Sequence, residues 1–473
     1  MALLYQSDKQ TVSRKRLVTR PGLARATLTS GTLCARACAY LLLAQVLHVQ
    51  RLGLFLLLQW LAYALLPLVA IGVAPLARRR IVALQAQELP HSAVSIFRLL
   101  WSRQCHRLAY YGVCYLPCAY LLSLISKGTL PFLSLVMAAI PVLPLCLSSV
   151  VGIALQSQGR HMLLSCLSLL YALLVLTLSL LVVYMQNKSI LQFDMLLLVP
   201  AFAHMGTLTL GLLSLSHVLP IRKVPPVGPL LAQRLKHATH VSPFRFLVDL
   251  CTWRELPALL LFPLVYPTQA SLIQISYYTL GLLFCTRLVE IVPLYFTMYF
   301  LPLLAHCAKR ETGRLFSLGS VDALVRSTYS IALLTTLLCT LCTVFCPQIV
   351  LFFLGPSYLP LVTIFRILLT GAAISSVAPV GLTAIEQRLH ALAVRHPQRK
   401  RQERAMHFLH LSTLGIYILL VIPCILCWGM VGVALTSTLV RAVSALGTLV
   451  LCRRFVVRSS PVATASPHST LIS

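Results

Sequence analysis

The sequence predicts an all-α integral membrane protein of about twelve transmembrane helices, in two six-helix pseudo-repeats around a central cavity. Two observations predict the membrane class. Of the 473 residues, 58% are hydrophobic and 10% are charged, which is more apolar side chain than a soluble domain of this length can hide from water. The apolar residues also come in blocks of roughly 20, the length that crosses about 30 Å of hydrocarbon. An internal repeat predicts the two halves.

The apolar blocks define the expected spans. The seventh is the least typical, because its first third carries Asp249, Arg254 and Glu255. The eighth and ninth are longer than the hydrocarbon is thick, which predicts a tilt or a continuation into the cytoplasm. In chain order the spans cover residues 27–49, 52–77, 108–126, 130–155, 162–185, 193–218, 247–268, 275–305, 323–353, 360–385, 406–427 and 429–452.

The distribution of Lys and Arg predicts the orientation. If the N-terminus is cytoplasmic, the inside segments hold 31 of the 39 basic residues, whereas the outside loops hold only Arg51, Lys127 and Lys188. Cytoplasmic loops of membrane proteins carry this excess of basic residues, and an even number of spans places both termini on one side. We therefore expect a multi-pass protein of the inner (plasma) membrane with both termini in the cytoplasm.

The net charge of +29 has the same explanation. Nucleic-acid binding would require a basic face interleaved with aromatic side chains, and the sequence has no such run. The basic residues instead follow the cytoplasmic loops, so we expect no nucleic-acid partner.

Two short matches indicate a duplicated unit. Pro75-Leu76 near the end of the second span corresponds to Pro302-Leu303 in the eighth, and Ser148-Ser149-Val150 in the fourth corresponds to Ser375-Ser376-Val377 in the tenth, both at an offset of 227 residues. A parallel repeat favours alternating access across a central cavity over a simple pore. The expected parts are a basic cytoplasmic tail (1–26), an N-terminal six-helix bundle (27–218), a Pro-rich cytoplasmic linker (219–246), a C-terminal six-helix bundle (247–452) and a cytoplasmic tail (453–473).

Segment 92–107 alternates apolar and basic residues at helical spacing. This pattern is typical of a helix that lies in the plane of the membrane surface, with Trp101 at the depth of the lipid headgroups. We therefore expect it to lie along the cytoplasmic interface before the third span.

No feature of the sequence indicates a catalytic centre, a metal or a cofactor. The sixteen cysteines lie mostly in apolar segments, where they act as small apolar residues, and the Cys339–Cys342 pair has no histidine or second pair nearby. His204 and His161 are isolated histidines, for which packing or interface roles are expected. The sequence lacks a GxxxxGK[ST] phosphate-binding loop, so an ATPase is not expected in this chain.

Three motifs resemble a known family of membrane transporters. The resemblance covers residues 250–452 well, and the first half mainly through its topology. The motifs are Ile275-Ser276-Tyr277-Tyr278 at the start of the eighth span; Phe353-Leu354-Gly355-Pro356-Ser357-Tyr358 leading into Phe365-Arg366-Ile367-Leu368; and Trp428-Gly429-Met430-Val431-Gly432-Val433-Ala434 between the last two spans. They resemble the Wzx-type polysaccharide (O-antigen) flippases of the multidrug/oligosaccharidyl-lipid/polysaccharide (MOP) exporter superfamily.

This resemblance implies a function. A flippase of this family moves an undecaprenyl-pyrophosphate-linked oligosaccharide across the inner membrane by alternating access, with membrane lipids and polysaccharide polymerase or ligase proteins as further partners. A cation-coupled multidrug antiporter of the same superfamily is one alternative. A peptidoglycan lipid-precursor flippase is another, although those proteins resemble fourteen-helix chains. An enzyme is not expected, because the outside loops are short and nearly free of acidic residues; a non-transporting scaffold stays open.

Charged residues inside the spans are the candidate site residues, because a charge at mid-bilayer costs at least about 2.5–3.5 kcal/mol. Arg287 and Glu290 share a helical face of the eighth span, either as a structural ion pair or as a cavity-lining pair in which Arg287 binds the pyrophosphate. Arg36, alone in the first span, is a second cavity candidate. Arg366 either reaches the nearby interface or contributes to the cavity. Asp249, Arg254 and Glu255 are candidates for a gate at the cytoplasmic mouth.

Overall fold

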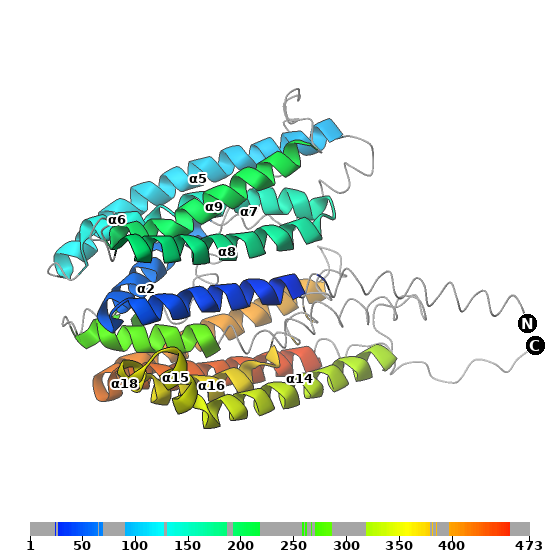
Figure 1. Cartoon of the computed structure of the whole chain (residues 1–473). Coiled ribbons are helices and arrows are strands. Elements are labelled where there is room, and N and C mark those ends of the chain that lie inside the picture. The colour runs from blue at the N-terminus through cyan, green and yellow to red at the C-terminus, as the bar shows by residue number, and fades with distance from the viewer. Residues whose placement is uncertain are drawn as a thin grey trace, which may run out of the picture.

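The computed structural model of the chain is all-helical in the residues it describes (Figure 1). These are residues 24, 27–64, 66–69, 90–126, 130–186, 193–217, 258–259, 261–262, 266, 270–285, 318–378, 381, 385 and 397–454. The predicted linker 219–246 and most of both predicted tails lie outside them. Below, the N-terminal half means described residues 27–217, and the C-terminal half means described residues 258–454.

The N-terminal half contains the first helix, Thr27–Val46. It is followed by α2 (Val49–Ala64), α3 (Leu66–Val69), α5 (Pro90–Ile125), α6 (Phe132–Ala139), α7 (Val142–Ser157), α8 (His161–Gln186) and α9 (Asp194–Ser216). The C-terminal half contains the helix Ala270–Cys285. It is followed by α14 (Leu318–Val344), α15 (Cys346–Phe353), the 3₁₀ turn η1 (Pro356–Tyr358), α16 (Leu361–Ser375) and α18 (Pro397–Cys452).

The helices have the length and composition of membrane spans. Six described helices are long and apolar enough to cross a membrane, or seven if the bent pair α14–α15 counts as one span. The helices Ala270–Cys285 and Leu361–Ser375 are apolar but shorter. The chain is therefore a multi-pass membrane protein.

Two predicted spans are each divided into two helices. The fourth is divided into α6 and α7, and Pro141 lies at the start of α7. The ninth bends by 66° between α14 and α15, where Pro347 occupies the first turn of α15. Proline lacks an N–H and clashes with the preceding turn, so it ends or bends a helix at these positions.

Segment 92–107 differs from the prediction. It continues without a break into the third span as part of the 36-residue helix α5, so it is not a separate helix at the membrane surface. Val94, Phe97 and Leu100 are buried in a cluster with residues of α7 and α9. The apolar side of the segment is therefore buried against neighbouring helices and does not face the lipid headgroups.

Helix α18 contains the last two predicted spans as a hairpin. Gly429 adopts φ 59° and ψ −137°, a conformation that interrupts the helix and favours glycine. A Cβ at Gly432 would lie 2.1 Å from the carbonyl oxygen of Cys424, and a Cβ at Gly447 would lie 2.3 Å from Leu409. Both contacts pair residues on opposite sides of the turn, so the chain folds back there as predicted.

The two halves meet at the end of the bundle that carries α6, α15 and η1, called the far end here (Figure 1). The Tyr358 hydroxyl donates to the Ala44 carbonyl at 2.9 Å, and Gln45 Nε2 donates to the Phe353 carbonyl at 2.7 Å. A Cβ at Gly53 would lie 1.9 Å from the Leu272 carbonyl oxygen, so α2 and the helix Ala270–Cys285 approach closely there. We call these three contacts the far-end seam. The first helix begins, and α18 ends, at the opposite end of the bundle.

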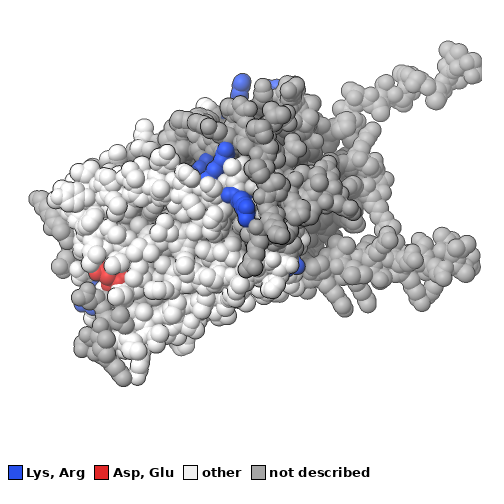
Figure 2. Space-filling view, turned by 90° about the horizontal axis from the view of Figure 1, so that it is seen from above, with Lys and Arg blue, Asp and Glu red and all other residues white. Residues whose placement is uncertain are grey.

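The described surface is almost free of charge. In the face that Figure 2 shows, the blue Lys and Arg atoms lie mostly beside the undescribed region, and a red acidic group lies near the far end. Large apolar side chains point outward from the helices between these ends, including Leu333 (75% exposed) and Leu337 (66% exposed) on α14. An apolar band between charged ends is the surface that a bilayer requires.

Candidate functional site

A cavity of about 430 Å³ lies between the first helix, α2, α8 and α9. This volume lies in the range of ligand-binding pockets. Helix Ala270–Cys285 contributes Thr279 and Leu283 to its wall, so the C-terminal half closes one side. The rest of the wall is mainly aliphatic and aromatic, with Phe55, Trp60 and Tyr63 from α2. The cavity is thus largely apolar, and the few polar groups in it are informative.

Arg36 is the cationic residue of this wall. Its guanidinium carbon lies 4.9 Å from the centroid of the Tyr171 ring, a distance at which a cation is attracted to the face of an aromatic ring. Its Nε is buried and makes no hydrogen bond. In the described part of the chain, no carboxylate lines the cavity or pairs with Arg36. The guanidinium therefore retains hydrogen-bonding capacity and positive charge for an anionic group.

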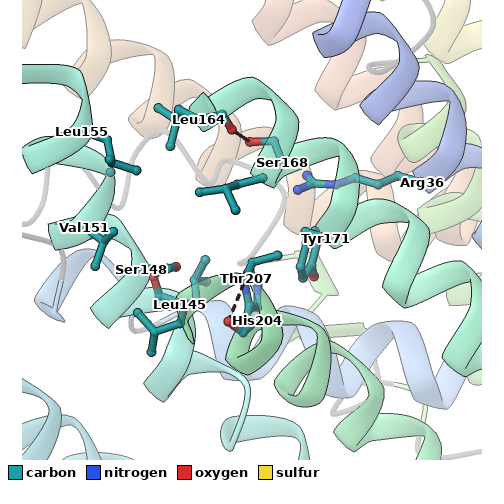
Figure 3. Close-up of a pocket in the computed structure, with 13 residues that line it drawn as sticks. Arg36, Leu145, Ser148, Val151, Leu155, Leu164, Ser168, Tyr171, His204 and Thr207 are labelled. Atoms are coloured by element: carbon teal, nitrogen blue, oxygen red, sulfur yellow. Dashed lines mark hydrogen bonds between the residues drawn. The ribbon is translucent and has the colours of Figure 1, made fainter. Parts of the chain in front are cut away.

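Tyr171 is held between Arg36 and His204. Its ring stacks on the His204 ring with centroids 4.0 Å apart and an angle of 24° between the planes. His204 is 8% exposed and comes from α9, whereas Tyr171 comes from α8 and Arg36 from the first helix. Three helices thus supply one stack, which fixes the position of the guanidinium (Figure 3).

A second polar group in the same wall is the pair Tyr40 and Gln59. The Tyr40 hydroxyl donates to Gln59 Oε1 at 3.3 Å, linking the first helix to α2. The Gln59 amide nitrogen is a donor that this bond does not use. The pair adds a neutral polar contact site to a wall whose charge comes from Arg36.

A smaller cavity of about 200 Å³ lies between α7, α8 and α9 and meets the first one. Arg36, Leu145, Tyr171 and His204 line both cavities. Figure 3 shows the guanidinium of Arg36 above Tyr171, pointing toward the space that the smaller cavity occupies. Arg36 is therefore accessible from two sides.

The predicted site residues have different outcomes. Arg36 lines both cavities, and its role in binding a substrate stays a prediction. Arg366 is exposed on α16, its Nε donates to the Thr343 carbonyl at 3.3 Å, and it does not line either cavity. The remaining predicted site residues lie outside the described residues: Arg287, Glu290, Asp249, Arg254 and Glu255.

Sequence reasoning missed the aromatic part of the site. Tyr171 was not singled out, and His204 was expected to have only a packing or interface role, whereas it lines both cavities. Each comes from a different helix than Arg36, and helical periodicity relates only residues on one helix. The sequence feature that could have indicated these two residues is the presence of a tyrosine and a histidine inside otherwise aliphatic spans.

The three motifs that carry the family resemblance converge at the far end. The Tyr277 hydroxyl donates to the Ser357 carbonyl at 2.8 Å, which joins the first motif to the second. The Met430 N–H donates to Gln274 Oε1 at 3.4 Å, so the third motif meets the residue just before the first. The motifs therefore form the closed end of the C-terminal half and are not part of the Arg36 cavity.

This arrangement of helices defines a class of protein by its fold: a multi-pass helical membrane protein with the fold of solved MATE transporters. The particular solved structures that resemble the chain are MATE transporters. A point mutant of VcmN from Vibrio cholerae has a TM-score of 0.53 and 13% identity, and the match covers 95% of this chain and 98% of that one. The eukaryotic MATE transporter AtDTX14 has a TM-score of 0.51 and 11% identity, covering 93% and 98%.

A third structure is described as the inward-facing conformation of a multidrug resistance MATE family transporter of the MOP superfamily. It has a TM-score of 0.50 and 12% identity, and the match covers 91% of this chain and 94% of that one. No protein-family model matches the sequence, and no curated protein matches it. At these identities the likeness shows the fold alone.

The likeness confirms the predicted fold class, because MATE transporters have twelve transmembrane helices in two pseudo-repeats. One of these structures is described as a member of the MOP superfamily, the superfamily that the sequence motifs resemble. The resemblance of the three sequence motifs to Wzx-type flippases, which is more specific than the superfamily, stays a prediction.

Proposed function

We propose that this protein is an alternating-access exporter whose substrate carries an anionic group, and that this substrate is a lipid-linked oligosaccharide diphosphate. The observation that carries the proposal is the Arg36 guanidinium, held over Tyr171 in a cavity of about 430 Å³ with its Nε unpaired. A guanidinium presents planar donors that match phosphate oxygens, and such charge-assisted bonds are strong in an apolar surrounding.

The composition of the cavity supports an amphipathic substrate. A charged headgroup fits the Arg36 side, whereas the aromatic and aliphatic remainder accepts apolar groups. The three sequence motifs support the polysaccharide branch of the superfamily. In this proposal the lipid tail stays in the bilayer while the diphosphate and sugars cross through the cavity, from the cytoplasmic to the outer leaflet.

A cation-coupled multidrug antiporter is the second candidate, and the similar MATE structures favour it. Such a protein would bind cationic compounds. The charge of Arg36 repels cations, and the described cavity wall has no carboxylate to offset it. The wall therefore favours the anionic substrate.

The far-end seam is the set of contacts that would open and close during alternating access. Alternating access requires that the contacts closing one end break when that end opens. Those contacts are the bonds from Tyr358 to Ala44 and from Gln45 to Phe353, together with the close approach at Gly53. We propose that the far end faces the outer side and is closed in this conformation.

A leaflet assay in proteoliposomes tests the proposed function. The purified protein is reconstituted with a fluorescent polyprenyl-diphosphate oligosaccharide, and arrival in the opposite leaflet is measured. We expect transport by the wild type, a loss of at least about tenfold in Arg36→Ala, and partial retention in Arg36→Lys, which keeps the charge but not the planar fork.

Arg51→Ala is the matched control, because Arg51 is an exposed arginine at the start of α2 that lines neither cavity. Thermal unfolding of each variant shows whether it is folded. Transport of a cationic dye by the wild type, together with no movement of the lipid-linked sugar, would contradict the proposal and favour the antiporter.

A further inference from the structure

The smaller cavity between α7, α8 and α9 is called the side chamber here. It holds about 200 Å³ and opens beside Arg36, at the residues that it shares with the main cavity. A ligand whose anionic group binds Arg36 therefore places its next chemical group at the mouth of the side chamber.

Three aliphatic hydroxyl groups line the side chamber, one each from α7, α8 and α9, in addition to the phenol of Tyr171. Ser148 Oγ on α7 donates to the Leu145 carbonyl at 2.7 Å, and Ser168 Oγ on α8 donates to the Leu164 carbonyl at 3.0 Å. Thr207 Oγ1 on α9 donates to the His204 carbonyl at 3.1 Å, and the bond is drawn in Figure 3.

Each of these hydroxyls has a single proton, and each proton is used within its own helix. The oxygens are left with acceptor lone pairs. The side chamber therefore offers hydrogen-bond acceptors, in contrast to Arg36, which offers donors and positive charge. A matching ligand carries a negative group and, directly beside it, several hydrogen-bond donors.

The rest of the side chamber is apolar. Much of its wall is formed by Val151, Leu155 and Leu164. At Gly152 the wall is the α7 backbone itself, because glycine has no side chain to fill the cavity. A metal cation would also accept lone pairs from hydroxyls, but it would lie beside the charge of Arg36, which opposes it. A sugar ring meets both conditions, since it presents hydroxyl donors on its rim and C–H groups on its faces.

We propose that the side chamber binds the sugar residue that is directly attached to the phosphate held by Arg36. The ligand class is thus a glycosyl phosphate, with the phosphate at Arg36 and the ring among Ser148, Ser168 and Thr207. The inference rests on the proposed function, because it uses the same Arg36 anion site. It adds that the protein recognises the sugar attached to the phosphate, and not only the negative charge of that phosphate.

Two kinds of variant test the side chamber. The double variant Ser148→Ala/Ser168→Ala removes two acceptors without adding volume. Gly152→Val fills the space: a Cβ there would contact only Leu164 Cδ1, at 3.6 Å, so the first added carbon fits without a clash. The matched controls are Ser214→Ala/Ser216→Ala, whose hydroxyls also donate to their own helix, and Gly112→Val, where a Cβ would have no neighbour within 4 Å.

The measurement is equilibrium binding to the full-length protein in nanodiscs. The probes are polyprenyl diphosphate with one attached sugar, polyprenyl diphosphate without sugar, and a soluble sugar 1-phosphate. We expect the wild type to bind the sugar-bearing lipid about tenfold more tightly than the sugar-free lipid. The side-chamber variants lose this preference and still bind the sugar-free lipid, whereas the controls keep the preference.

The outcomes separate this inference from the proposed function. If both lipids bind through Arg36 and the side-chamber variants keep the wild-type preference for the sugar, the side chamber is not the sugar site and the inference fails. If Arg36→Ala leaves the binding of both lipids unchanged, the anion site fails and the inference fails with it. Tighter binding of the soluble sugar 1-phosphate than of the lipid would keep the sugar site but assign it to a soluble glycosyl phosphate.

Discussion

The two halves of the molecule share a helical plan but differ in how their described interiors are filled. In the N-terminal half, the first helix, α2, α7, α8 and α9 surround two cavities that meet at Arg36. In the C-terminal half, glycines bring helices into direct contact. A Cβ at Gly371 would lie 2.7 Å from Thr438 Oγ1, and one at Gly432 would lie 2.1 Å from the Cys424 carbonyl oxygen.

This difference indicates a division of roles after duplication. The described C-terminal helices α16 and α18 are closely packed at Gly371, Gly432 and Gly447, where an added Cβ would clash. The N-terminal half keeps open space together with a cationic and aromatic stack. Similar helix order therefore does not imply similar chemistry, since binding is determined by which side chains face the interior.

The largest effect is expected where the C-terminal interior is tightest. Gly432→Ala places a methyl group against the backbone of Cys424, within the α18 hairpin. The two helical arms are joined by the turn at Gly429, so neither arm can move away without disrupting that turn. We expect a loss of stability of about 3 kcal/mol or more. Thermal unfolding in detergent measures it.

Gly31→Ala is the control for this change in the N-terminal half. Its Cβ would make an ordinary contact of 3.6 Å with Leu169, and alanine favours a helix over glycine by up to about 1 kcal/mol. We therefore expect unchanged or higher stability. Equal destabilisation by both substitutions would contradict the contrast between the halves.

The next effect is expected where the halves meet. Gly53→Ala directs a methyl group at the Leu272 carbonyl, which lies in the other half. In the proposed alternating-access cycle the halves separate at this end, so we expect the far end to open, at a cost of about 1–3 kcal/mol to the closed conformation. Transport should fall about tenfold, while hydrogen–deuterium exchange rises in segments 44–50 and 353–359.

The comparison for Gly53 is Gly112→Ala on α5, where an added Cβ meets open space. This variant should transport like the wild type and show unchanged exchange at both segments. If Gly53→Ala also transports normally, the far-end seam does not take part in the transport cycle.

The smallest effect is expected from a single hydrogen bond across the seam. Tyr358→Phe removes the bond from the hydroxyl to the Ala44 carbonyl, which is worth about 1 kcal/mol. We expect a population shift of about fivefold toward an open far end, read from faster exchange of segment 44–50. Tyr329→Phe on α14, where the side chain is 73% exposed, should leave this exchange unchanged.

Much of the fold could be predicted from hydropathy and charge. Apolar blocks of membrane-spanning length located the described spans to within a few residues at most ends, as for α8 and α9. The interruption before α7 at Pro141, the bend before α15 near Pro347 and the continuous course of α5 were not predicted. These depend on which neighbour covers an apolar face, and hydropathy gives no information on neighbours.

The candidate site was predictable only in part. Arg36 was identified because a charge inside a span requires an explanation. Its partners Tyr171 and His204 could not be assigned, since contacts between separate helices depend on their rotation and packing. Arg366 shows the converse case, in which the same rule selects a residue whose guanidinium bonds to the backbone carbonyl of Thr343.

The length of α5 has a mechanical consequence. Its 36 residues extend about 54 Å, well beyond the roughly 30 Å of hydrocarbon, and the part that begins with Val94 is anchored among α7 and α9. Pro117 lies inside this helix, in the part that follows the packed segment, so we expect the segment from Val94 to move with its bundle. In the proposed transport cycle, a small rotation at the far-end seam produces a large displacement at the Pro90 end of α5, which lies at the opposite end of the bundle (Figure 1). A spectroscopic label at that end is therefore expected to report the cycle.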